Sequence, residues 1–249
     1  MLFRSTHHLR RLHFTDSVSE LAALRLTNRV LAKLRSYGLI SPLARRIGGI
    51  RAGSAAFVWT LTPVGARLLA LKNNNDAPRK RSYEPSIIFL KHTLALSEVA
   101  VRLHEMDRAH KLSLITTANE PNCWRTYSGA GGAAKTLKPD LFAITASEEY
   151  EDNWFLELDR NTEIPSTVIK KCKQYIAYYK TGGEQRKYGV FPYVVWIVPD
   201  EKRCGQLAAR IAKELPAKDA RLFIVTLMDE LEALLTSGAE NFSKERKTL

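Results

Sequence analysis

The chain has 249 residues, of which 45% are apolar and 26% are charged, and its formal net charge at pH 7 is +12. This composition predicts a packed globular core and argues against a wholly disordered chain. The sequence contains no apolar run of about 18 residues and no apolar leader, so we expect neither a membrane span nor a secretory signal. It also contains no C-x-x-C pair, so we expect neither a zinc ribbon nor a disulfide scaffold. These features together predict a cytoplasmic protein.

The excess positive charge lies in the first third of the chain. Residues 1–91 contain 16 Lys and Arg but only 4 Asp and Glu, whereas residues 92–249 contain 22 of each type. Such asymmetry predicts two modules, the first of which binds a polyanion. Nucleic acid is the favoured polyanion, and an anionic membrane surface is the weaker alternative.

Helical patterns come first in the chain. A first helix is predicted over residues 4–14. The run Ser17–Glu20 is typical of a capping box and begins a short second helix that extends through Ala23. Thr27 is the predicted N-cap of a third helix, which Gly38 ends. Two short helices, a turn and a third helix predict a helix-turn-helix motif.

The outward face of the third predicted helix is basic and polar. Side chains of these types bind base edges and phosphates in a major groove, although a solvated basic face is the alternative. The predicted DNA-binding residues on this helix are Asn28, Arg29, Lys33 and Arg35.

Two strand-like segments, residues 39–46 and 57–61, flank a basic, glycine-rich loop. A two-stranded ribbon with such a tip, directly after a helix-turn-helix, predicts a winged-helix domain over residues 1–71. The loop residues expected to bind the DNA backbone are Arg45, Arg46 and Arg51. Residues 72–85 are polar and basic and contain two prolines, so they are predicted to form a linker.

The second predicted module, residues 86–238, alternates between helical and strand-like patterns. Apolar periodicity predicts helices over residues 87–106, 166–179, 201–215 and 228–235 and strands over residues 112–117, 141–145, 154–158, 193–198 and 222–225. Residues 122–138 are glycine-rich and are expected to form a loop. The order predicts an α/β (α+β) protein with a mixed sheet flanked by helices, followed by a polar tail over residues 239–249.

Three acids lie at the ends of two neighbouring strands in this module. Asp140 precedes one apolar strand, and Glu157 and Asp159 end the next. Alternation places Glu157 and Asp159 on one face, and pairing of the two strands as a hairpin brings Asp140 close to Glu157. Clustered carboxylates repel one another unless a cation intervenes, which favours a site for Mg²⁺ or Mn²⁺. The alternatives are a strand-start cap for Asp140 and, for Asp159, a salt bridge to Arg160 or to a helix lysine.

This pattern resembles a known nuclease motif. Pro139-Asp140, sixteen intervening residues and Glu157-Leu158-Asp159 are similar to the motif of the PD-(D/E)XK nuclease superfamily, which implies a restriction-endonuclease-like domain. Together with an N-terminal winged helix and the run from Glu157 to Glu163, the sequence more narrowly resembles the replication-relaxation family over about residues 9–200. Members of that family are associated with plasmid replication and DNA relaxation.

The resemblance implies roles for individual residues. Asp140 and Glu157 would bind Mg²⁺ or Mn²⁺, and Glu98, on the helix before the first strand, matches an additional acid found in some members. Lys171, Gln174 and Tyr175, on the helix after the core strands, match polar positions that often contact the scissile phosphate.

One position departs from the superfamily pattern. Asp159 stands where the superfamily usually has a lysine that positions the attacking water. Some active members carry an acid there, so Asp159 is retained as a predicted catalytic and metal-binding residue. In other members a neighbouring helix supplies the lysine, for which Lys170, Lys171 and Lys173 are candidates, and in others again activity is lost.

Two functions therefore remain open. The first is a metal-dependent DNA endonuclease or nickase of a plasmid or other mobile element, acting in replication, relaxation or transfer. The second is a catalytically inactive DNA-binding replication accessory or transcription regulator with a nuclease fold. Double-stranded DNA is the expected partner under both readings. A second copy of the chain and other replication or transfer proteins are further candidates, and no membrane contact is expected.

Overall fold

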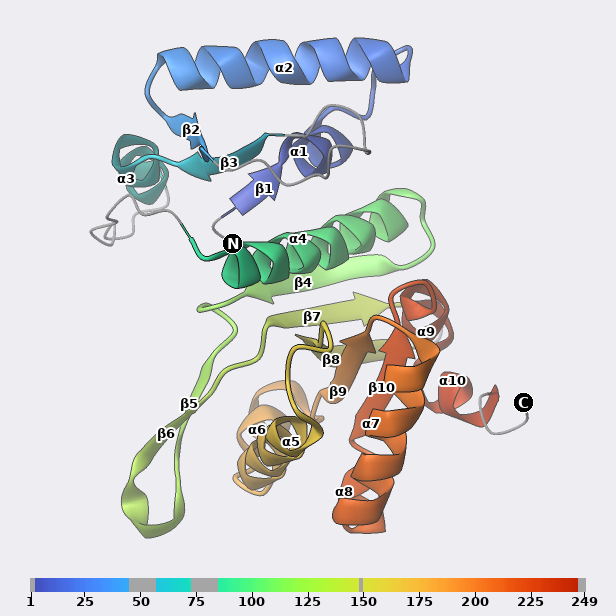
Figure 1. The fold of residues 1–249 in the computed structure, drawn as a ribbon. Coiled ribbons are helices and arrows are strands. Elements are labelled where there is room, and N and C mark those ends of the chain that lie inside the picture. The colour runs from blue at the N-terminus through green and yellow to red at the C-terminus, as the bar shows by residue number, and fades with distance from the viewer. Residues whose placement is uncertain (1–2, 45–56, 73–84, 148–149, 246–249) are drawn as a thin grey trace. The chain divides into compact units, whose positions relative to one another are not determined.

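The computed structural model describes residues 3–44, 57–72, 85–147 and 150–245 of the chain. The chain divides into two compact units, Met1–Glu105 and Met106–Leu249 (Figure 1). The predicted linker falls almost entirely outside the described residues, so the predicted domain boundaries stay predictions. None of the described helices is long and apolar enough to cross a membrane.

The N-terminal unit contains a small antiparallel sheet with the strand order β1-β3-β2. Its described strands are β1 (Phe3–Ser5), β2 (Ile40–Pro42) and β3 (Val58–Leu61). Its described helices are α1 (Thr6–His13), α2 (Glu20–Ser36), α3 (Pro63–Lys72) and most of α4 (Ile87–Arg108). Four buried side chains form one cluster of its core, namely Phe3, Leu43, Val58 and Leu90.

The prediction of two separate helices around Thr27 was wrong. Residues 20–36 form the single helix α2, whose N-cap is Ser19 and not Ser17. Thr27 is buried within this helix, and its hydroxyl donates a hydrogen bond to the Ala23 carbonyl, 2.7 Å away. Ala23, Thr27 and Leu31 are spaced four residues apart and bury one face of α2. This tertiary burial outweighs the preference of threonine for an N-cap.

The first predicted helix also begins later than expected. Phe3–Ser5 is a strand that pairs with β3, and α1 follows it directly. The Ser5 hydroxyl oxygen accepts a hydrogen bond from the backbone N–H of His8, at 3.1 Å, and so caps α1. The turn between two helices therefore lies between α1 and α2, over residues 14–19.

The C-terminal unit is built on a mixed sheet with the strand order β10-β9-β8-β7-β4. Its strands are β4 (Ser113–Asn119), β7 (Leu141–Ala146), β8 (Glu151–Leu158), β9 (Tyr193–Val198) and β10 (Phe223–Leu227). Strand β7 pairs antiparallel with both β4 and β8, whereas β8, β9 and β10 are mutually parallel. The predicted α/β (α+β) class, with a mixed sheet flanked by helices, is confirmed.

The helices of this unit connect and cover the strands. They are α5 (Pro165–Tyr179), α6 (Gly183–Tyr188), α7 (Glu201–Glu214), α8 (Ala217–Ala220), α9 (Leu231–Ser237) and α10 (Ala239–Glu245). A continuous core joins one face of the sheet to α5 and α7, and its fully buried members include Phe155, Tyr175, Val194 and Leu207. The crossover from β8 through α5 to β9 thus holds α5 against the end of β8.

The glycine-rich segment predicted as a loop contains regular structure. Strands β5 (Arg125–Ser128) and β6 (Ala134–Leu137) pair antiparallel, and the short 3₁₀ turn Ala130–Gly132 joins them. Gly131 and Gly132 both have φ near +80°, at 78° and 79°, which explains glycine at the tip.

Candidate active site

Asp140 and Glu157 are placed by the pairing of β7 with β8. Leu141 pairs with Leu156 in this antiparallel ladder, so Asp140, just before β7, lies opposite the end of β8 that carries Glu157. The Asp140 Oδ2 atom accepts a hydrogen bond from the backbone N–H of Leu158, at 2.9 Å. The backbone of β8 thereby fixes one oxygen of the Asp140 carboxylate.

Helix α5 supplies a lysine to these two acids. The Lys171 ammonium forms an ion pair with Glu157 and lies 3.9 Å from Asp140 Oδ1. The Tyr175 hydroxyl, one helical turn further along α5, donates a hydrogen bond to the other oxygen of Glu157. Asp140, Glu157, Lys171 and Tyr175, which we call the carboxylate–lysine site, therefore come together in the folded chain.

Burial dominates the electrostatics of this site. Glu157 is only 1% exposed. Burial, together with the negative charge of Asp140, raises the pKa of Glu157 above its ordinary value, although Lys171 opposes this shift. Burial acts to lower the pKa of Lys171, but the attraction of Glu157 and Asp140 outweighs burial and raises that pKa above its ordinary value. Lys171 is therefore protonated at neutral pH.

The Asp159 carboxylate forms an ion pair with Arg203 and not with Lys171. Its side chain is buried and accepts a hydrogen bond from Arg203 Nε on α7, at 2.6 Å, and one from the backbone N–H of Asn161, at 2.8 Å. Arg203 also donates to the carbonyl of Glu163, at 2.6 Å, and to the side chain of Gln206, at 2.9 Å. The structure thus shows the Asp159 carboxylate clamping the turn after β8 to α7.

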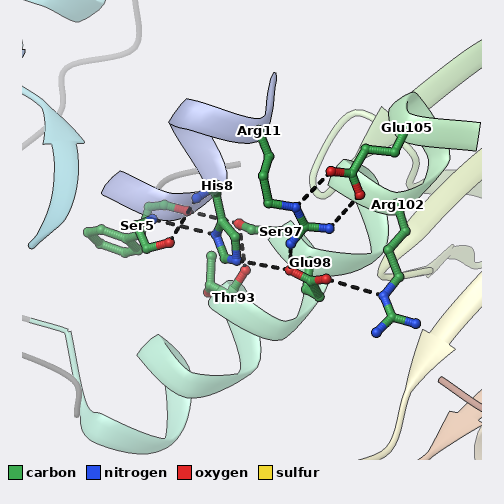
Figure 2. Close-up of polar contacts among 9 residues, drawn as sticks. Ser5, His8, Arg11, Thr93, Ser97, Glu98, Arg102 and Glu105 are labelled. Carbon is green, nitrogen blue, oxygen red and sulfur yellow. Dashed lines mark hydrogen bonds and ion pairs between the residues drawn. The ribbon is translucent and has the colours of Figure 1, made fainter. Parts of the chain in front are cut away.

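Glu98 and Gln174 are not members of the carboxylate–lysine site. Glu98 is on α4 in the N-terminal unit, where its carboxylate contacts His8, Arg11 and Arg102 at 3.4, 2.6 and 3.2 Å (Figure 2). Gln174 is exposed on α5. Among the residues that the structure describes, no three His, Cys, Asp or Glu side chains are grouped as a metal site.

Two residues near the site were missed by sequence reasoning. Arg203 lies 44 residues after Asp159, within an amphipathic helix, and nothing in the local sequence indicates its partner. Cys123 is buried and its thiol donates to the Pro139 carbonyl, at 2.9 Å, which tethers the segment before Asp140. Burial raises the pKa of this thiol to about 12, so it is a neutral packing group.

The predicted DNA-binding residues of α2, namely Asn28, Arg29, Lys33 and Arg35, are all exposed. Arg29 and Lys33 lie opposite the buried face formed by Ala23, Thr27 and Leu31, and Asn28 and Arg35 lie on one flank of the helix. The Lys33 ammonium lies 5.9 Å from the centre of the Tyr37 ring, which is itself exposed. The predicted wing residues Arg45, Arg46 and Arg51 lie outside the described part of the chain.

A comparison with protein families finds one model that covers the N-terminal unit and part of the C-terminal unit. The model described as Replication-relaxation matches residues 1–194, well over half of the chain. The matched range includes α2 and every member of the carboxylate–lysine site. No curated protein and no solved structure matches the chain.

Proposed function

The chain belongs to the replication-relaxation family and so has a replication-related function, and we propose that it acts as a metal-dependent DNA endonuclease or nickase of a plasmid or other mobile element. The convergence of Asp140, Glu157 and Lys171 carries this proposal. Two carboxylates from adjacent strands and one protonated lysine form the set of groups that phosphodiester hydrolysis needs in a nuclease of this kind.

Lys171 is the proposed replacement for the lysine that the superfamily usually carries at the position of Asp159. Its ammonium already lies within reach of both acids, whereas Asp159 is engaged with Arg203. Because Lys171 stays protonated at neutral pH, its role is to donate to a phosphate oxygen and offset the negative charge that develops there. It is not the base that takes a proton from water.

The acids fit a divalent cation by the chemistry of their donor atoms. Mg²⁺ in proteins is commonly bound through one or two carboxylates, with water and substrate phosphate completing its shell. Asp140 and Glu157 would hold the ion, which when bound polarises the phosphate and lowers the pKa of its bound water. Leu158 fixes Asp140 through its backbone N–H, and Tyr175 fixes Glu157 through its hydroxyl. These contacts keep both carboxylates oriented.

The N-terminal unit is the proposed double-stranded DNA-binding part. Its order of elements, strand, helix, helix, strand and strand, supports a winged helix in which α1 and α2 form the helix-turn-helix. In this reading α2 is the recognition helix, and its exposed Asn28, Arg29, Lys33 and Arg35 face a major groove. The net charge of +12 that lies in residues 1–91 supports a polyanionic partner.

A second candidate is a nuclease-fold scaffold without catalysis, acting as a replication accessory or transcription regulator. Asp159 stands at the position where the superfamily usually has its active-site lysine, and it forms an ion pair with Arg203. Both observations favour the scaffold. A close ion pair between Lys171 and Glu157 also satisfies both side chains without a cation. Partners such as a second copy of the chain or other replication proteins stay predictions under both readings.

Nicking of supercoiled plasmid in Mg²⁺ or Mn²⁺ separates the two candidates. We expect the wild-type protein to convert supercoiled DNA to open circles, and we expect Asp140→Asn and Lys171→Met to abolish this conversion while DNA affinity is retained. Lys180→Met, an exposed lysine at the end of the same helix, is the matched control and should keep full activity. A wild-type protein that binds DNA but leaves plasmid intact with every divalent ion would establish the scaffold reading.

A further inference from the structure

The β5–β6 hairpin leads directly into the carboxylate–lysine site. It leaves the mixed sheet as a long two-stranded ribbon (Figure 1), and β6 ends at Leu137, three residues before Asp140. Its base is anchored, because Arg125 forms an ion pair with the buried Glu184 of α6 at 2.6 Å. The Tyr127 ring also lies 5.2 Å from the Tyr178 ring of α5, centre to centre. One face of the ribbon is therefore attached to the helices beside the site.

The other face of the ribbon is turned to solvent. Residues directly opposite in an antiparallel ladder share a face, as do alternate residues along each strand. The register pairs Thr126 with Thr136 and Ser128 with Ala134. The same register continues to Trp124 and Lys138, and the Lys138 ammonium lies 4.5 Å from the centre of the Trp124 ring. The members of this outer face are all exposed and are Trp124, Thr126, Ser128, Ala134, Thr136 and Lys138.

The charge of this segment differs from that of the rest of its unit. Residues 121–139 contain three basic residues and no acidic residue, whereas residues 92–249 as a whole are neutral. Glu184 neutralises Arg125, and Lys135 pairs with Tyr127 on the attached face, so Lys138 is the exposed cation of the outer face. Lysine and threonine or serine hydroxyls are typical contacts to DNA phosphates, and an exposed tryptophan can stack on a base. A two-stranded ribbon also has the dimensions to enter a major groove.

We propose that the outer face of the β5–β6 hairpin is a DNA-binding arm that holds the duplex backbone beside the scissile phosphate and positions that phosphate at Asp140, Glu157 and Lys171. This inference rests on the proposed nuclease function and adds a substrate contact that belongs to the C-terminal unit itself. Lys138 and Trp124 form the end of the arm nearest the site, since Lys138 is two residues before Asp140. The glycine tip is the distal end, where a Cβ at Gly131 or Gly132 would meet no atom within 4 Å.

Site-specific crosslinking tests the arm without requiring catalysis. All three native cysteines are buried, so a cysteine introduced at an exposed position can be labelled selectively with a photoactivatable maleimide. The full chain carrying Thr136→Cys is irradiated with duplex DNA in EDTA and compared with Lys218→Cys, an exposed position on α8. We expect at least fivefold more DNA adduct from the Thr136 position. Equal yields at the two positions would overturn the proposal, whether or not the wild-type protein nicks plasmid.

Charge reversal provides the second measurement. Lys138→Glu should lower the slope of log affinity against log salt by about 1, because each lysine that binds a phosphate contributes about 1 to that slope. The same variant should slow any nicking at least tenfold. The matched control is Lys218→Glu, at an exposed lysine on α8, and it should leave both quantities unchanged. An unchanged slope in the arm variant refutes the proposal. Loss of nicking in Asp140→Asn with an unchanged slope would at the same time uphold the catalytic site.

Discussion

The ion pair between Arg203 of α7 and Asp159, directly after β8, is predicted to stabilise the C-terminal unit. We predict that Arg203→Met destabilises the protein strongly, because it leaves the Asp159 carboxylate buried without its cation. Arg203 is itself buried and donates hydrogen bonds to Asp159, to the Glu163 carbonyl and to Gln206. Removing one partner of a buried ion pair typically costs about 3–5 kcal/mol.

That loss is a large fraction of the stability of an ordinary domain, which is about 5–15 kcal/mol. For a unit of this size it corresponds to a fall in melting temperature on the order of 10 °C. Urea unfolding followed by circular dichroism gives the free energy of unfolding directly. Arg203→Met combined with Asp159→Asn should recover part of the loss, because the double variant no longer buries an unpaired carboxylate.

The same variants separate a structural role of Asp159 from a metal-binding role. If Asp159 serves to clamp α7, Asp159→Asn should lower stability but leave metal-induced stabilisation of the remaining folded protein intact. A loss below about 1 kcal/mol for Arg203→Met, in the range of an exposed ion pair, would refute the clamp. Complete loss of metal-induced stabilisation in a folded Asp159→Asn protein would instead return Asp159 to the metal site.

Three further predictions follow from the carboxylate–lysine site, from α2 and from α4. Mn²⁺ should raise the melting temperature of the wild-type protein, and Asp140→Asn or Glu157→Gln should abolish that rise in a thermal-shift assay. Arg29→Ala or Lys33→Ala should weaken DNA binding and each lower the salt slope by about 1, measured by fluorescence anisotropy. Hydrogen bonds from His8 and Arg11 hold the pKa of Glu98 well below its ordinary value of 4.5, so Glu98→Gln should lower stability at pH 7, by about 2 kcal/mol, and less at low pH.

The sign of the last prediction follows from the protonation of Glu98. A depressed pKa in the folded state means that the carboxylate stabilises the fold at pH values above 4.5, and that this contribution is lost as pH falls through the folded pKa. The difference between wild type and Glu98→Gln, measured by urea unfolding at pH 7 and pH 3, should therefore shrink at the lower pH. An equal or larger difference at pH 3 would contradict the ion network of Figure 2.

Controls for the other two predictions come from exposed positions. Lys213→Ala should leave the salt slope of DNA binding unchanged, because this lysine is on α7, outside both α2 and the β5–β6 hairpin. Gln174→Ala, on the exposed face of α5, should retain the full metal-induced rise in melting temperature. A rise that persists in both Asp140→Asn and Glu157→Gln would mean that the ion binds elsewhere.

The central strands and the position of Glu157 could be predicted from sequence because their signals are local. An acid between Leu156 and Leu158 in an apolar strand needs a partner, and the strand period places it toward the helix-covered face. The run from Tyr193 to Val198 was likewise predicted with the bounds that β9 has, since a continuous apolar stretch of this length indicates a strand buried on both faces.

The errors arose where tertiary contacts override local preference. Threonine is a common N-cap residue, but the Thr27 hydroxyl donates a hydrogen bond to the Ala23 carbonyl and the side chain is buried within α2. The hairpin at residues 125–137 is short, rich in small residues and interrupted by glycines, so its strand signal is weak. The Arg203–Asp159 pair could not be predicted, because its members come from elements that only the folded sheet brings together.

The carboxylate–lysine site is assembled from one continuous stretch of chain, from Asp140 to Tyr175. Its internal contacts join residues 14 to 31 positions apart, through one hairpin and the helix that follows it. Short contact separations favour early formation during folding, because little loop-closure entropy opposes them. Closing the loops within the site therefore costs less chain entropy than bringing Arg203 to Asp159, which lies 44 residues earlier in the chain.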